Sequence, residues 1–514
     1  MIRMLAPITA LLFSVGLLLA GNGLQTTLLP IRGNLEGFSP FTLGLMGSSY
    51  YGGFALGCLL VPFAVVVAGH IRAFTAMVSL ASAAALLHPL IVDPVAWCLF
   101  RLVAGFCLAG IYLIVESWLN DQADNANRGF IMSAYIFVVF AMQTVGQMIV
   151  VLGDPTSFPL FAIASILVSL AVIPVAMTRS AQPAPITIVR IRFFSLYRIS
   201  PVGFVGAVVS GMSLASLWAL GTVYATLKGF STDTAAYFLS AAVAGGTLAQ
   251  WPVGRLSDRM DRRRVMLAIM GLAGLFGLIL AIFNLPQTLL LITAGLFGAA
   301  LLPMYSLAAA HTYDHVESDA FVEVAAGVIL ANSVGAVIGP LIASKSLDML
   351  GPGGLFYAIA AFMAAMIGFT VFRMNVSPRV AADDRTDFEV YATAPAGAVV
   401  TPEPLEEDSE YVVVPEAWTS EDETDVQWKE GEDAAGDEEE AAPAKATAAA
   451  AYAVEDAEIV EADATEGEAD PKAGKEAGEK TGKKNDGDDP DGKDSGDKDS
   501  GDKDSGDADT LPRL

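Results

Sequence analysis

The sequence has little cysteine, little histidine and few charged residues for its length. It contains 3 cysteines and 4 histidines in 514 residues, and only 17% of its residues are charged. Cys58, Cys98 and Cys107 all lie in apolar runs, where a thiol behaves as a small hydrophobic side chain, so a secreted disulfide scaffold is excluded. Because no residues cluster with metal-ligand spacing, we expect no metal, no other cofactor and no catalytic residues. The chain is therefore not predicted to be an enzyme.

The charges that are present are divided unevenly along the chain. The formal net charge is −26, yet 54% of the residues are hydrophobic and the mean hydropathy is +0.51. Residues 1–374 carry 17 Lys and Arg against 14 Asp and Glu, whereas residues 375–514 carry 13 against 42. The acidity therefore belongs to the C-terminal segment alone, and so acidic a chain is not expected to bind nucleic acid.

Long apolar runs occupy the first 374 residues. A helix needs roughly 20 mostly apolar residues to cross the hydrocarbon core of a membrane. The sequence predicts twelve such helices, over residues 7–29, 41–68, 73–92, 95–118, 130–152, 159–177, 201–225, 232–253, 265–283, 287–310, 325–346 and 355–374. The first run is one member of this series rather than a cleavable signal peptide.

Lysine and arginine in the short loops predict the orientation. With the N-terminus in the cytoplasm, twelve loop arginines lie inside and three basic residues lie outside, so both termini are predicted to be cytoplasmic. The longest internal break, residues 178–200, carries four arginines and divides the runs six and six. We therefore expect an N-terminal six-helix bundle over 1–177, a basic cytoplasmic linker over 178–200 and a C-terminal six-helix bundle over 201–374. This all-α architecture is typical of a secondary transporter.

Two charged residues lie well inside the predicted membrane helices, and both are on the fourth, residues 95–118. At 100° per residue, Arg101, Gly105, Tyr112 and Glu116 fall on one helix face. An unpaired charge costs several kcal/mol in hydrocarbon, so Arg101 is expected to point into a polar cavity or at a carbonyl group. Glu116 is either an interfacial residue that pairs with a loop arginine or a group that handles substrate or protons.

Polar and aromatic side chains on the predicted helices mark a candidate substrate-binding site. Each alone can instead make a hydrogen bond between helices, but together they predict a polar, aromatic-lined path. The predicted substrate-binding residues are Asn22, Gln25, Tyr50, Arg101, Tyr135, Gln143, Gln147, Trp218, Tyr224 and Asn332. If transport is coupled to protons, the candidates are Glu116, as the proton carrier, and Arg101, as its modulator.

The loop between the eighth and ninth runs reads Gly254-Arg-Leu-Ser-Asp258-Arg-Met-Asp261-Arg-Arg-Arg264. The glycine is expected to end a helix, and the acid four residues later can cap the neighbouring helix and bind an arginine. The two helices would then be held together at their cytoplasmic ends. The alternative is that the arginines only satisfy the positive-inside rule for cytoplasmic loops. The predicted conformational latch consists of Gly254, Asp258, Arg259, Arg262 and Arg263.

This loop resembles the signature of the major facilitator superfamily, G-x-L-[AS]-D-R-x-G-R-[RK], except that Asp261 stands where the last glycine is expected. Arg101-Leu-Val-Ala-Gly105 is similar to the R-x-x-x-G motif on the fourth helix of that family, which is associated in some members with proton coupling. The strings GHIRAF and ESWLN, with Asn127-Arg128-Gly129, resemble the YcaD-like branch. The resemblance covers residues 1–374 and implies a twelve-helix transporter that works by alternating access.

Residues 375–514 are predicted to form a disordered, acidic, low-complexity tail, because they cannot bury enough apolar surface to fold. Two segments in it are more hydrophobic, Phe388–Val400 and Tyr411–Trp418. The tail is expected to be a solvated chain repelled by the anionic inner leaflet, a binding segment for a cytoplasmic protein partner, or a regulator that contacts the basic loops.

We therefore expect a secondary active transporter in the inner (plasma) membrane. It would move a small-molecule substrate across the lipid bilayer and would function as a monomer. The alternative is a transporter-like membrane sensor or scaffold whose cytoplasmic tail recruits partners.

Overall fold

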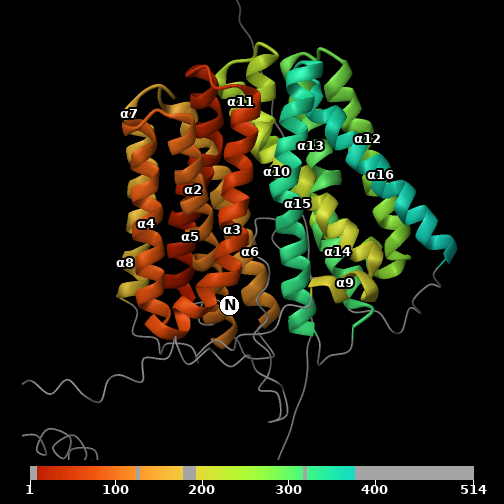
Figure 1. The fold of residues 1–514 in the computed structure, drawn as a ribbon, viewed down its shortest axis with the longest axis horizontal. Helices are drawn as coiled ribbons and strands as arrows, with labels where there is room; N and C mark the ends of the chain where they lie inside the picture. Colours follow the sequence, from red (N-terminus) through yellow and green to blue (C-terminus); the bar gives the residue numbers. More distant parts are fainter. Residues whose placement is uncertain (1–7, 123–127, 178–192, 317–320, 377–514) are drawn as a thin grey trace, which may run out of the picture. The chain divides into compact units, whose positions relative to one another are not determined.

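The structure is a computed structural model, and it describes residues 8–122, 128–177, 193–316 and 321–376. The regular structure in these ranges is helical, as predicted (Figure 1). In chain order the elements are α2 (Thr9–Leu35), α3 (Pro40–Ala68), α4 (His70–Leu90), α5 (Pro94–Asp121), α6 (Arg128–Ile149), η2 (Val150–Leu152), α7 (Phe158–Leu170), α8 (Val172–Ala176), α9 (Phe193–Ile199), α10 (Pro201–Leu227), α11 (Thr232–Arg259), α12 (Arg262–Ile282), α13 (Gln287–Leu301), α14 (Pro303–Tyr313), α15 (Phe321–Leu350) and α16 (Gly354–Val376). The chain divides into two units, Met1–Thr424 and Asp425–Leu514, and every described residue belongs to the first.

Eleven helical runs among the described residues are long and apolar enough to cross a membrane. They coincide with eleven of the twelve predicted runs. The remaining one, 232–253, forms α11, which has 28 residues but is not among the eleven. Its middle is rich in alanine and glycine and contains Ser240, Thr247 and Gln250, so it is less apolar than its neighbours.

The boundaries of three predicted segments differ from those in the structure. The tenth run, 287–310, is divided into α13 and α14 at Pro303, because proline cannot donate to the preceding turn. The predicted linker contains a helix, α9, in its last part; residues 178–192 and the tail beyond residue 376 lie outside the described residues. Gly254 was expected to end a helix, but α11 continues for five more residues to Arg259.

Helices α2 to α8 pack mainly against one another, and α10 to α16 do the same (Figure 1, red to orange and yellow to cyan). The two groups also touch, because α3 lies along α15 and α10, and α6 contacts α11. At the start of α3, a Cβ added to Gly44 would lie 2.5 Å from Cβ of Ser344 on α15. Near the end of α6, Ser240 Oγ on α11 donates a hydrogen bond to Gln147 Oε1 at 2.9 Å.

The start of α5 is fixed by polar contacts that determine where Arg101 lies. Asp93 caps the helix by accepting a hydrogen bond from the Ala96 amide at 2.8 Å. One turn further, the indole of Trp97 donates to the carbonyl oxygens of His88, at 3.0 Å, and Ile91, at 2.9 Å. These contacts hold the first turn of α5 against the end of α4, one turn before Arg101.

Glycines allow α3 and α5 to approach at backbone distance. A Cβ on Gly53 would lie 1.8 Å from the carbonyl oxygen of Leu102, and one on Gly105 would lie 1.8 Å from that of Tyr50. Small residues at such crossings permit the close packing that stabilises helices in a membrane. The packing brings Tyr50 on α3 next to Arg101 on α5.

Candidate functional site

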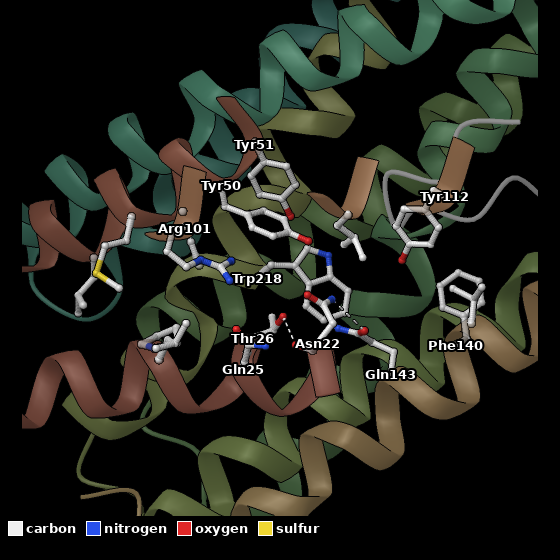
Figure 2. A pocket seen from close by; sticks show the side chains of 18 residues that line it. Asn22, Gln25, Thr26, Tyr50, Tyr51, Arg101, Tyr112, Phe140, Gln143 and Trp218 are labelled. Carbon is white, nitrogen blue, oxygen red and sulfur yellow. Dashed lines mark hydrogen bonds between the residues drawn. The ribbon is translucent and has the colours of Figure 1, made fainter. Parts of the chain in front are cut away.

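A cavity lies between α2, α3, α5, α6 and α10 (Figure 2). Its volume is about 60 Å³, measured as the space open to the centre of a water molecule. One water needs ~10–15 Å³ on this measure, so the cavity has room for a few water-sized groups. The lining is partly aromatic and partly polar. Its labelled residues in Figure 2 are Asn22, Gln25, Thr26, Tyr50, Tyr51, Arg101, Tyr112, Phe140, Gln143 and Trp218.

Arg101 is the one charged residue among the described residues that line the cavity. Its guanidinium carbon lies 4.0 Å from the centroid of the Tyr50 ring, which is a cation–π contact. The side chain is 8% exposed, and its Nη1 atom is buried and has no hydrogen-bond partner in the described part of the chain. Figure 2 shows the guanidinium pointing between the α3 tyrosines and the α2 residues. The arginine therefore offers an unused donor to the cavity.

Carboxamides line the side of the cavity formed by α2 and α6. Asn22 Nδ2 donates to Gln143 Oε1 at 3.4 Å, and Thr26 Oγ1 donates to the Asn22 carbonyl oxygen at 2.8 Å (Figure 2, dashed lines). Gln25 is also among the lining residues and is 6% exposed. These neutral groups can donate or accept, so they can orient hydroxyl or amide groups of a solute.

The structure brings six of the ten predicted substrate-binding residues together in this cavity. They are Asn22, Gln25, Tyr50, Arg101, Gln143 and Trp218. Asn332 lines a separate, smaller cavity whose wall shares Tyr51 with the first, and its Oδ1 atom is buried without a partner in the described residues. The main cavity is thus built from predicted residues on both groups of helices.

The other three predicted residues lie elsewhere. Gln147 is fully buried in the contact with Ser240 between α6 and α11. The hydroxyl of Tyr224 donates to the Leu280 carbonyl oxygen at 2.7 Å, and its ring packs against Phe238 and Phe356. The hydroxyl of Tyr135 donates to the carboxylate of Glu116, which lies outside the cavity. A tyrosine in a membrane helix can satisfy its hydroxyl on a neighbouring helix, and this is what separates Tyr224 and Tyr135 from the cavity.

Several lining residues were absent from the predicted set. Tyr51 and Thr26 adjoin predicted residues, and Tyr112 lies on the same face of α5 as Arg101, so a sequence signal for these three existed. The apolar lining carried no such signal, because leucine, valine and phenylalanine are abundant in every membrane helix. This lining includes Leu29, Leu43, Met46, Leu108, Val139 and Phe140.

Glu116 is buried on the face of α5 that continues beyond the cavity. It is 1% exposed, and Tyr135 OH on α6 donates to its Oε1 atom at 3.1 Å. Tyr112 lies one turn away toward the cavity, and its hydroxyl is buried without a partner in the described residues. Next to Glu116, Ser117 Oγ lies 3.4 Å from Nε2 of His70. Polar groups therefore follow one another along α5 from the cavity to the carboxylate.

The predicted latch residues surround the turn between α11 and α12. Here the structure corrects the predicted cap: the residue that caps α12 is Asp261, not Asp258. Asp261 Oδ1 accepts from the Arg263 amide at 3.0 Å, and Asp261 Oδ2 lies 3.2 Å from Arg263 Nη2. The acid that replaces the family glycine thus takes the position where a helix start needs an acceptor.

A second ion pair links this turn to α14. Arg262 Nε lies 2.8 Å from Asp314 Oδ2, and the two side chains are 1% and 2% exposed. Asp258 approaches Arg262 Nη2 only to 4.0 Å and is 40% exposed. Gly254 is buried within α11, whereas Arg259 is exposed at its end. The turn is therefore joined to α14 mainly through Arg262 and Asp314.

Comparison with known proteins shows which family the chain resembles. A family model described as Major Facilitator Superfamily matches residues 203–418. An uncharacterized MFS-type transporter, YcaD of Escherichia fergusonii, is 26% identical over 358 residues, which are 69% of this chain and 92% of that protein. The chain is thus similar to proteins of the major facilitator superfamily. The resemblance to the YcaD branch, which rested on short strings, is thereby confirmed.

Solved structures of two transporters have a similar fold. The nucleoside transporter NupG matches with a TM-score of 0.60 at 14% identity, covering 72% of this chain and 98% of that one. A D-xylose-proton symporter matches with a TM-score of 0.58 at 13% identity, covering 73% and 98%. Identities this low concern the fold alone.

Proposed function

We propose that this chain is a secondary active transporter that moves a small solute across the inner membrane by alternating access. The observation that carries the proposal is the cavity around Arg101. Its walls come from α2, α3, α5 and α6 within residues 1–177 and from α10 within residues 201–374. A site between two such bundles can be exposed to one side and then to the other as they move.

The proposal includes α11 as the twelfth membrane helix. At 1.5 Å per residue, a helix of its length is ~40 Å long, more than the ~30 Å of a hydrocarbon core. Its polar residues can be accommodated because it packs against α13, α10 and α6, and Gln250 is 3% exposed. The chain then has two bundles of six helices, 1–177 and 201–374, joined by the linker 178–200.

We place both termini in the cytoplasm, because the loop arginines are concentrated on that side. In this orientation, the contact of Gly44 with Ser344 and that of Gln147 with Ser240 lie at the periplasmic ends of their helices. These contacts hold the two bundles together on the periplasmic side. Opening toward the periplasm would require both to separate.

Proton coupling is assigned to Glu116. A buried carboxyl group in a membrane helix is costly when charged and is a recurrent proton carrier in transporters. Tyr135 donates to it at 3.1 Å, and Tyr112 lies between it and the cavity. Protonation of Glu116 would then affect the cavity, because Tyr112 and Arg101 lie on the same face of α5 and line the cavity.

The Arg262–Asp314 pair is proposed to act as the latch. It joins the α11–α12 turn to the end of α14, and both groups are almost fully buried. Removing one partner of a buried ion pair is costly, because it leaves the other charge buried without compensation. We therefore expect this pair to bias the balance between inward-facing and outward-facing states.

The test is solute flux into proteoliposomes that contain the full-length protein. Neutral solutes (D-xylose and uridine) and small carboxylates (glycolate, L-lactate and D-glycerate) are offered, and the trapped solute is measured by mass spectrometry with and without an imposed pH gradient. We expect accumulation of at least one solute above empty liposomes. Ligand binding without flux would contradict transport and would favour the sensor or scaffold.

A further inference from the structure

We propose that the ligand of the main cavity is a small organic acid with one carboxylate, bound by Arg101. This inference rests on the proposed function, since it names the class of solute that the same site takes. It depends on the unbalanced charge of the cavity, on the unused donor of Arg101 and on the size of the free space.

The first observation is the absence of a counter-charge. None of the described residues that line the cavity is an aspartate or a glutamate, and the ion pairs of the described residues do not include Arg101. Burying a guanidinium costs free energy unless an anion or several acceptors compensate it. The ring of Tyr50 compensates part of this cost from one face.

The second observation is the unpartnered Nη1 atom. Arg101 is more than nine-tenths buried, and this donor has no acceptor among the described residues. The guanidinium presents parallel N–H groups that match the two oxygens of a carboxylate. A ligand carboxylate would therefore supply both the missing charge and the missing acceptor.

The charge and the size of the site favour a carboxylate over a phosphate. A phosphate monoester carries close to two charges at neutral pH, and the cavity supplies one cation. The free space, about 60 Å³ for water centres, suits a molecule of a few heavy atoms. Asn22, Gln25 and Gln143 are then placed to orient a hydroxyl group on the same molecule.

The experiment measures dissociation constants on the purified full-length chain by isothermal titration. The probes are glycolate, L-lactate and D-glycerate, their uncharged amides, and inorganic phosphate. We expect at least one carboxylate to bind about ten- to a hundredfold more tightly than its amide, as charge-assisted hydrogen bonds would give. The proposal is overturned if no carboxylate binds, if an amide binds equally well, or if phosphate binds more tightly.

Variants test whether Arg101 is the residue that binds the carboxylate. Arg101→Gln should abolish the preference for the carboxylate over its amide, and Arg101→Lys should retain part of it. The matched control is Arg255→Gln, which removes an arginine that lies 4.4 Å over the Trp251 ring outside the cavity and should leave the preference intact. If Arg101→Gln fails to fold, the comparison of acid with amide on the unmodified chain still decides the question.

Transport and binding can fail separately. Flux of a neutral solute with no preference for carboxylates would overturn this inference and leave the proposed transporter standing. Binding of a carboxylate that depends on Arg101 but gives no flux of any solute would support the ligand class and contradict transport.

Discussion

The guanidinium of Arg101 lies over the ring of Tyr50 at 4.0 Å, and the two residues come from different helices that touch at their backbones. The charge is thus held by an aromatic face on one side and is open to the cavity on the other. This relationship connects the packing of α3 and α5 to the chemistry of the site.

Replacing Tyr50 tests the aromatic face. Tyr50→Phe keeps the ring and should bind the carboxylate probes nearly as well as the unmodified protein. Tyr50→Leu removes the ring and should weaken their binding about two- to thirtyfold, the range of a cation–π contact. Isothermal titration compares the two variants. Equal affinity for both would show that the ring does not stabilise the bound state.

Replacing glycine on α3 tests the close packing. Gly53→Ala should lower the free energy of unfolding by roughly 1–3 kcal/mol, because the new methyl group would overlap the Leu102 carbonyl. The neighbouring Gly52→Ala is the matched control, since nothing lies within 4 Å of a Cβ at that position. Thermal unfolding in detergent gives both values. A Gly53 variant as stable as the Gly52 variant would count against the described crossing.

Replacing Glu116 tests the proton carrier. Glu116→Gln mimics the protonated side chain, so an inward-directed pH gradient should no longer drive accumulation. Exchange of solute at equal pH should continue. Tyr135→Phe, which removes one donor to the carboxylate, should shift the pH dependence of uptake without abolishing it. Accumulation by Glu116→Gln that still follows the gradient would exclude this residue as the carrier.

Replacing Asp314 or Asp258 tests the latch. Asp314→Asn should destabilise the described state by about 3–5 kcal/mol, because it removes one partner of a buried ion pair. Asp258→Asn should cost ~0–1 kcal/mol, because that carboxylate is 40% exposed and 4.0 Å from Arg262.

The readout for the latch is thermal unfolding together with maleimide labelling of Thr26→Cys, a cavity position, in a background without the natural cysteines. Asp314→Asn should change the labelling rate more than Asp258→Asn does. The reverse order, or labelling identical to the parent for both, would contradict the assignment of the latch to Asp314.

The sequence predicted the helices well because hydropathy over ~20 residues reports directly on the membrane. It predicted six cavity residues, with Arg101 among them, because a polar side chain in a membrane helix is costly and is therefore often functional. It placed the cap on Asp258, because which of two nearby acids lies just before the first turn depends on where α11 ends.

Long-range pairs were beyond the reach of the sequence pattern. Asp314 lies 52 positions after Arg262, and nothing in the local sequence of either residue indicates the other. Tyr224 illustrates the opposite error. A tyrosine in a membrane helix is a reasonable candidate for a binding site, but the hydroxyl of Tyr224 donates to the Leu280 carbonyl oxygen instead. Only the packing of the helices separates these cases.

The most direct test of the central claim compares solute uptake by the unmodified protein and by Arg101→Gln in proteoliposomes. Gel filtration of the purified proteins checks that both are folded, and quantitative blotting of the proteoliposomes checks that equal amounts are inserted. The account predicts uptake of at least one small solute by the unmodified protein, a loss of uptake in Arg101→Gln, and no loss in Arg255→Gln. Uptake by Arg101→Gln equal to that of the unmodified protein would contradict it.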